Sequence, residues 1–236
     1  MNLNIYGRQQ SIQSLADMFI LIADMKNYLD GKINFDTEGK PAFKKESFLQ
    51  DWPKAVVPYD NRNGSKVIDK ASTVLCFFEG DRRIYPRMKQ IFKEIEIYRQ
   101  YMGVAFPDIT ITEDMDAEWQ DVTIILNQLF AAILAVNGIK IICNTRIGSD
   151  NTIKCMDNIP RGVMGISGFY GCDKSRNFLD ALRYINKMMF LGLERVIIYG
   201  KEDKLINDLL QVNGIAYRYY PVYRKLRIGG ICNGRL

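Results

Sequence analysis

The chain has 236 residues, 47% of them hydrophobic, enough for one large α/β domain with its own core. The net charge of +5 allows a basic face for nucleic acid but does not demand one. There is no histidine, which excludes the usual general base at neutral pH, Ser-His and Cys-His nucleophile pairs and most transition-metal sites. Catalysis would have to use carboxylates, Lys, Tyr or Cys, with Mg²⁺ as the metal that suits oxygen ligands.

The cysteines and the apolar runs narrow the class of protein further. Five cysteines are an odd number, widely spaced and without a CxxC pair, so we expect neither a disulfide framework nor a zinc site. The apolar run at residues 18–23 is too short for a membrane helix. The first residues also lack the basic start and small-residue cleavage site of a signal peptide. We therefore expect a cytoplasmic protein that does not contact a membrane.

The first part of the chain is expected to form a helical arm. Apolar residues recur at helical spacing from Leu15 to Leu29, and Asp30 and Gly31 end the pattern. Residues 31–53 are mixed and charged. We interpret residues 1–53 as an N-terminal arm or cap on the main domain.

From residue 54 to 223, short apolar runs alternate with helical patterns. The expected strands are residues 54–60, 73–81, 103–111, 139–150, 162–169, 194–201 and 215–223. The expected helices are residues 85–102, 114–138, 175–192 and 203–214. About seven β/α units imply a mostly parallel sheet with helices outside it. A barrel-like sheet and a doubly wound sheet both fit, with a slight preference for the barrel-like form, and a basic tail follows at 224–236.

Both architectures bind ligands where the carboxyl ends of parallel strands meet. The catalytic candidates at these ends are the carboxylates Glu79, Asp81 and Asp108. The binding candidates are Arg83, Asn144, Arg146, Asp150, Ser167, Tyr170 and Lys201. The carboxylates could hold Mg²⁺ or act as acids and bases, and the cations could bind phosphate, so the set favours a nucleotide or nucleic acid. A structural explanation also stands, because an acid after a strand can cap the next helix.

The loop "SGFYGCDKS" at residues 167–175 has two interpretations. Its glycines at 168 and 171 match neither GxGxxG nor GxxxxGK[ST]. Backbone N–H groups at the start of the next helix could attract an anion, or the glycines could simply permit a tight turn. Both interpretations remain open.

Five strings in order resemble an uncharacterised family, a numbered domain of unknown function seen in bacteriophages, conjugative elements and Gram-positive bacteria. They are "FFEGDRR", "GVAFPDIT", "NGIKIICNTRIGSD", "GISGFYGC" and "ERVIIYGK", and the resemblance covers about residues 50–222. It implies a phage or mobile-element protein in the host cytoplasm, but no reaction. The recurrent polar positions of the family match Glu79, Asp81, Arg83, Asp108, Asp114, Gln120, Asn127, Asn144, Arg146, Asp150, Cys172 and Tyr199.

The chain also departs from that family. Relatives carry an Arg-x-Arg pair where this chain has Leu126 and Gln128, a Gln at Ala135, and often His or Thr at Phe169. If those groups serve catalysis, the resemblance implies a weakened or altered enzyme, or one redeployed as a binder.

Two functions therefore compete. The first is a protein that binds or acts on a nucleotide or nucleic acid at the strand ends. The second is a non-catalytic phage interaction protein that binds a host or defence protein. The second draws on the departures above and on the Tyr- and Arg-rich end "YRYYPVYRKLRIGGICNGRL". A last strand followed by a disordered basic end explains that segment more simply.

Overall fold

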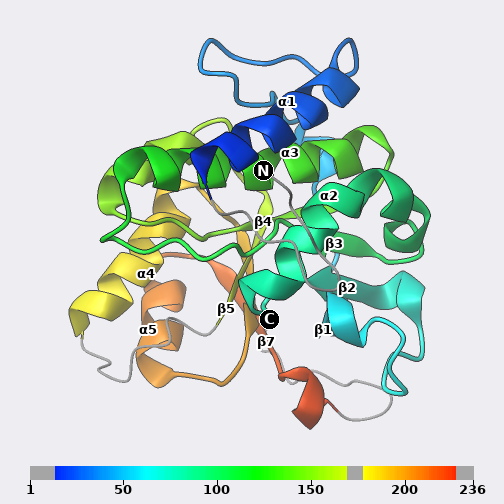
Figure 1. The fold of residues 1–236 in the computed structure, drawn as a ribbon. Helices are drawn as coiled ribbons and strands as arrows, with labels where there is room; N and C mark the ends of the chain where they lie inside the picture. The colour runs from blue at the N-terminus through cyan, green and yellow to red at the C-terminus, as the bar shows by residue number, and fades with distance from the viewer. Residues whose placement is uncertain (1–13, 169–177, 227–236) are drawn as a thin grey trace.

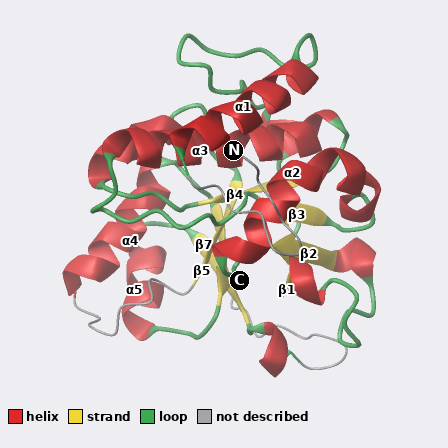
Figure 2. Ribbon diagram, in the orientation of Figure 1, coloured by secondary structure: helices red, strands yellow, loops and turns green. Residues whose placement is uncertain are grey.

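The computed structural model describes residues 14–168 and 178–226 (Figure 1). Seven strands form one sheet in which every neighbouring pair is parallel and the spatial order follows the chain. The strands are β1 (Ala55–Pro58), β2 (Thr73–Cys76), β3 (Gly103–Ala105), β4 (Ile141–Asn144), β5 (Met164–Gly168), β6 (Arg195–Tyr199) and β7 (Ala216–Tyr220). The sheet curls into a nearly closed barrel surrounded by helices (Figure 2). The barrel-like prediction is confirmed, and the doubly wound alternative is wrong because that topology needs a reversal of strand order.

The helices match the predicted segments, but two starts are shifted: α2 begins four residues earlier than expected and α3 three residues later. They are α1 (Leu15–Leu29), α2 (Asp81–Tyr98), α3 (Ala117–Val136), α4 (Phe178–Phe190) and α5 (Lys204–Val212). α2 begins at Asp81 and contains Pro86, whereas the sequence placed its start at residue 85. The carboxylate of Asp81 accepts hydrogen bonds from the backbone N–H and hydroxyl of Thr110, both at 3.0 Å. The local hydrophobic periodicity of the sequence does not predict this contact with a distant loop.

The barrel interior is a packed core and not a pore. Strand residues alternate between the interior and the helix-facing side. The interior cluster consists of Leu49, Val56, Val74, Cys76, Ala105, Ile142, Met164, Ile166, Ile197, Tyr199 and Tyr220. Leu49 precedes β1, and its N–H donates to the carbonyl of Ile141 at 2.9 Å. Residues before the first strand thus help to close the amino end of the barrel.

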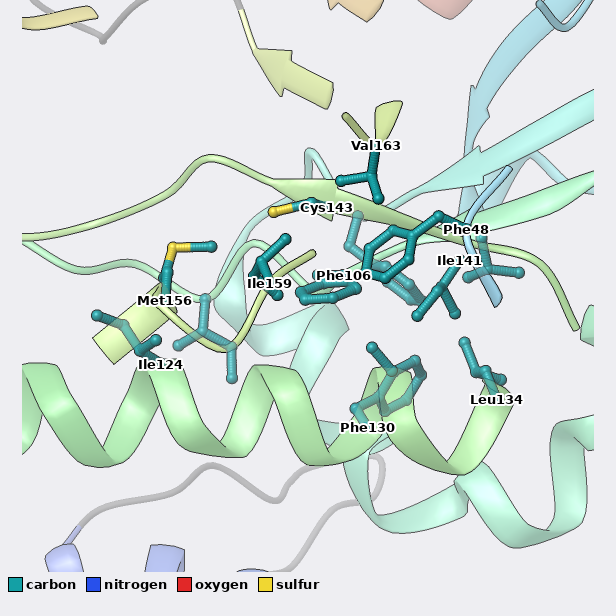
Figure 3. Close-up of a cluster of buried hydrophobic side chains, with 14 of the residues drawn as sticks. Phe48, Phe106, Ile124, Phe130, Leu134, Ile141, Cys143, Met156, Ile159 and Val163 are labelled. Atoms are coloured by element: carbon teal, nitrogen blue, oxygen red, sulfur yellow. The ribbon is translucent and has the colours of Figure 1, made fainter. Parts of the chain in front are cut away.

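A larger core lies between the sheet and its helices. Phe130 and Leu134 of α3 point toward the strands, where Phe48 and Phe106 meet them (Figure 3). α1 lies across the outer side of α3 (Figure 1). By length and composition α3 could cross a membrane, but 72% of its most apolar window is buried inside the protein. Burial of that extent is typical of a core helix.

Side chains close the barrel between its first and last strands. In the part of the chain that the structure describes, no backbone ladder joins β1 to β7. Instead the buried Tyr220 hydroxyl donates to the carbonyl of Pro53 at 2.8 Å. The guanidinium of Arg218 lies 4.9 Å from the centroid of a Trp52 ring. Lys66 Nζ donates at 3.1 and 2.9 Å to the carbonyls of residues 223 and 224, just after β7. We call this junction the β1–β7 seam.

Candidate functional site

Three predicted residues meet at the carboxyl end of the barrel. Asn144 ends β4 on the interior side, two residues after the interior Ile142. Its Nδ2 donates to Asp108 Oδ1 at 2.9 Å, and Arg146 Nη1 lies 3.8 Å from the same oxygen. Asp108 stands three residues beyond β3 and its side chain is 15% exposed, against 35% for Arg146. We call Asp108, Asn144 and Arg146 the mouth cluster.

Burial dominates the protonation of Asp108. It raises the pKa of the carboxyl above its ordinary value, and the nearby Asp81 raises it further. The positive charge of Arg146, the hydrogen bond from Asn144 and the charge of Lys187 act in the opposite direction but do not cancel the shift. A carboxyl whose proton affinity is raised in this way is suited to acid–base chemistry.

Lys187 belongs to the same electrostatic group, and the sequence analysis missed it. Burial lowers the pKa of its ammonium to about 8, with a further contribution from Arg146, while Asp108 and Asp150 oppose the shift. The lysine lies on α4 next to the buried Met188. The sequence feature that could have indicated this residue is its place in α4, directly beside the apolar positions of the helix. Lys187 lies in the last turn of a helix and not at the end of a strand, so the convergence of strand ends does not predict it.

Gln120 of α3 ties together the two loops around the mouth cluster. Its side chain accepts from the N–H of Ser149 at 2.8 Å and donates to the carbonyl of Met115 at 2.7 Å. A Cβ on Gly148 would overlap the side-chain amide of Gln120 and a methyl group of Ile111, so a larger residue would have to displace the Gln120 amide from its hydrogen bonds. Gln120 thereby fixes the loop after β4, which carries Arg146, against the loop after β3, which carries Asp108.

Two other candidates form a separate group beside β1 and β2. Glu79 accepts a hydrogen bond from the N–H of Asp60 at 3.2 Å, and Arg83 forms an ion pair with the Asp60 carboxylate at 3.0 Å. Burial raises the pKa of Glu79, and the charge of Asp60 adds to the rise. Asp81 is electrostatically coupled to Asp108, but Thr110 engages its carboxylate, so it does not cap α2.

The remaining candidates lie outside the mouth cluster, although the charge of Asp150 acts on Lys187. Ser167 is on the helix-facing side of β5, and its hydroxyl donates to the carbonyl of Gly168 at 3.1 Å. Asp150 and Lys201 are exposed. Tyr170 lies outside the described residues, as does the loop from 169 to 175 and the tail from 227 onward. Leu226, which belongs to the predicted tail at 224–236, is buried at 4% exposure.

The predicted Mg²⁺ site has no three-acid cluster to support it in residues 14–168 and 178–226. No group of three or more His, Cys, Asp or Glu side chains is arranged there to hold a metal. The carboxylates of Asp81 and Asp108 are already engaged by Thr110 and by the mouth cluster. A role for Mg²⁺ stays a prediction that binding experiments must address.

An aromatic pair lies at the same end of the barrel. Phe78, two residues after β2, stacks on Tyr199 at the end of β6, with ring centroids 5.4 Å apart and planes 19° apart. The Tyr199 hydroxyl accepts from the N–H of Tyr223 at 2.9 Å. Phe78 is half-buried, so the carboxyl end offers an apolar ring surface as well as charge.

One comparison with known proteins gives a match. A family model described as "Domain of unknown function (DUF4417)" matches residues 37–221. Neither the curated proteins nor the solved structures gave a match. The matched range contains every strand of the barrel and the whole mouth cluster. Because the match spans well over half of the sequence, the chain belongs to the DUF4417 family.

Proposed function

We propose that the protein binds a nucleotide at the carboxyl end of the barrel, with Arg146 as the group that holds its phosphate. The observation that carries the proposal is that the Arg146 guanidinium is partly exposed and has no close carboxylate partner. Its closest carboxylate oxygen is 3.8 Å away from Nη1, beyond hydrogen-bonding distance, and the side chain is 35% exposed. Nη2 makes one long hydrogen bond, to the carbonyl of Ile111 at 3.5 Å. The guanidinium therefore keeps donors for a ligand, in a planar fork that matches phosphate oxygens.

The surroundings of Arg146 suit both the phosphate and the nucleobase of a nucleotide. Lys187 supplies a second cation near Asp108 and Arg146. The half-buried Phe78 supplies ring surface at the same end, and nucleic acid bases stack readily on aromatic side chains. Asp108, with its raised pKa, is the residue we assign to proton transfer if the ligand is also a substrate.

Calorimetric titration with inorganic phosphate, the four ribonucleoside monophosphates and a single-stranded oligonucleotide tests the proposal, each with and without Mg²⁺. Arg146→Gln removes the charge and the fork, so phosphate and nucleotide affinity should fall by about tenfold or more, the scale of a charge-assisted hydrogen bond. Arg99→Gln is the matched control. Arg99 forms an ion pair with Glu96 and donates to the carbonyl of Asn137 at 3.3 Å, at the C-terminal ends of α2 and α3.

The same titration separates the competing functions. Equal affinities for Arg146→Gln and wild type would contradict the role of Arg146. Binding of the oligonucleotide but of no mononucleotide would replace the nucleotide by nucleic acid. If wild type binds none of the probes, the proposal fails and the interaction-protein alternative takes its place.

A further inference from the structure

A small recess lies between α3, the end of β4 and the segment that follows β3, and Arg146 is part of its wall. Its volume is about 10 Å³, room for about one water-sized group. Apolar side chains of Phe106, Ile124 and Met156 form part of its wall. Pro107 and the polar side chains of Asn127, Gln128, Asn144 and Arg146 form the rest. Two of these four polar residues, Asn144 and Arg146, thus belong to the mouth cluster.

Asn127, which lines this recess, has a side-chain carbonyl oxygen without a partner. The residue is 6% exposed, and its Oδ1 is buried and accepts no hydrogen bond. Its neighbour Gln128 also lines the recess but is satisfied, because Nε2 donates to the carbonyl of Cys155 at 2.8 Å and Oε1 accepts from Asn158 Nδ2 at 2.9 Å. Buried polar groups in proteins are almost always paired, so the unpaired oxygen points to a donor from outside the chain.

The position of this oxygen favours a ligand over a purely structural role. Asn144 lines the recess and also holds Asp108, and Arg146 lines it while keeping exposed donors at the mouth. Because Arg146 is part of the wall, a ligand whose phosphate contacts Arg146 would lie beside the recess. The recess is far smaller than the hundreds of cubic ångströms needed for a whole ligand, so it can accommodate only one small group of a ligand.

We propose that the recess is a specificity subsite in which Asn127 Oδ1 accepts a hydrogen bond from one amino or hydroxyl group of the ligand. This rests on the proposed function, since Arg146 holds the phosphate of the same molecule. A subsite that contains a buried acceptor binds a donor-bearing ligand and discriminates against its donor-free analogue, because the analogue leaves that acceptor unpaired.

The test uses pairs of phosphates that differ in one donor group. Adenosine monophosphate is compared with purine riboside monophosphate, which lacks the amino group. Ribose 5-phosphate is compared with 2-deoxyribose 5-phosphate, which lacks one hydroxyl. Wild type should prefer the donor-bearing member of at least one pair by about tenfold, the value of one net hydrogen bond to a buried acceptor.

Variants at Asn127 identify the atom responsible. Asn127→Leu has nearly the same size and no acceptor, so the preference should fall to within about twofold while affinity for inorganic phosphate stays unchanged. Asn127→Asp retains the acceptor and should retain the preference. Asn207→Leu is the matched control, because Asn207 on α5 has another buried carbonyl oxygen without a partner. If Asn127→Leu does not fold, Asn127→Ala removes the same oxygen without filling the recess.

Three outcomes would overturn the subsite. In the first, wild type binds inorganic phosphate but has equal affinity for the two members of each pair. The phosphate site would then remain supported, and the recess would be only a site for a water molecule. A preference that survives in both Asn127→Leu and Asn127→Ala assigns it to other residues. Wild type that binds no phosphate at all removes the proposed function and the subsite together.

Discussion

Replacing Asp108 by asparagine separates the charge of this side chain from its hydrogen bond. Asparagine keeps an Oδ1 that can accept from Asn144, as the carboxylate does at 2.9 Å, but loses the attraction to Arg146 at 3.8 Å. Burial raises the pKa of Asp108 despite Arg146 and Asn144, so the ionised carboxyl is a net cost to the folded state. The variant should therefore be slightly more stable than wild type at neutral pH.

The size of the effect follows from two opposing contributions. Two unit charges about 4 Å apart attract by about 4 kcal/mol at an effective dielectric constant near 20. Arg146 is 35% exposed, and solvent screening reduces such pairs to about 1 kcal/mol or less. Desolvation of a carboxylate that is only 15% exposed opposes this remainder. We expect Asp108→Asn to raise the free energy of unfolding at pH 7 by no more than about 1 kcal/mol.

The pH dependence gives the sharper test. Since the folded-state pKa of Asp108 is raised, folded protein holds this proton more tightly than unfolded protein. The resulting stability is fully present below the unfolded pKa and is lost as the pH rises through the folded pKa. The variant lacks this titration, so its advantage over wild type should be near zero at pH 4 and grow toward pH 7. Urea denaturation at pH 4, 5.5 and 7 measures it. A loss of more than about 2 kcal/mol at pH 7, or a difference independent of pH, would refute the reasoning.

Three further changes test other parts of the structure. Gly148→Ala should lower the free energy of unfolding by about 1–3 kcal/mol in urea denaturation, because the new Cβ meets the Gln120 carbonyl; an unchanged midpoint would contradict the close approach. Tyr220→Phe should cost about 1 kcal/mol, since the buried Pro53 carbonyl loses its donor, and a neutral result would show that the seam does not need it. In NMR spectra of the lysine Cε groups, one resonance should titrate near the lowered pKa of about 8 and vanish in Lys187→Arg; if all lysines titrate above 10, the burial of Lys187 is wrong.

Strands β1 to β6 were predictable because nearly all their residues are buried on both faces of the sheet. A strand between helices and a packed interior is apolar at nearly every position, as in Arg195–Tyr199, so it appears as a continuous run. Strand ends were not predictable. The run 103–111 reads as one strand, yet β3 stops at Ala105. Ile109 and Ile111 are buried although they lie in a loop. Hydrophobicity alone cannot distinguish a buried loop from a strand.

The candidate site was only partly predictable. The convergence of parallel strand ends correctly placed Asp108, Asn144 and Arg146 side by side. The same rule could not show that Glu79 and Arg83 are engaged by Asp60, a residue after a different strand. It also could not reveal side chains that reach the site from helices. Lys187 and Asn127 do so because α4 and α3 pack beside the strand ends, which depends on tertiary packing.

Because the strand order follows the chain order, the barrel could be divided into two pieces by a single break in the chain. A break in the loop 157–163 would interrupt a single ladder, the two pairs Cys143↔Gly165 and Asn144↔Ile166 between β4 and β5. All other strand pairs would remain within one piece or the other. Each piece would then be a continuous half-barrel whose apolar inner face is complementary to that of the other. Because the mouth cluster lies wholly in the first piece while Lys187 lies in the second, reassembly of the halves would also restore the full charge balance of the site.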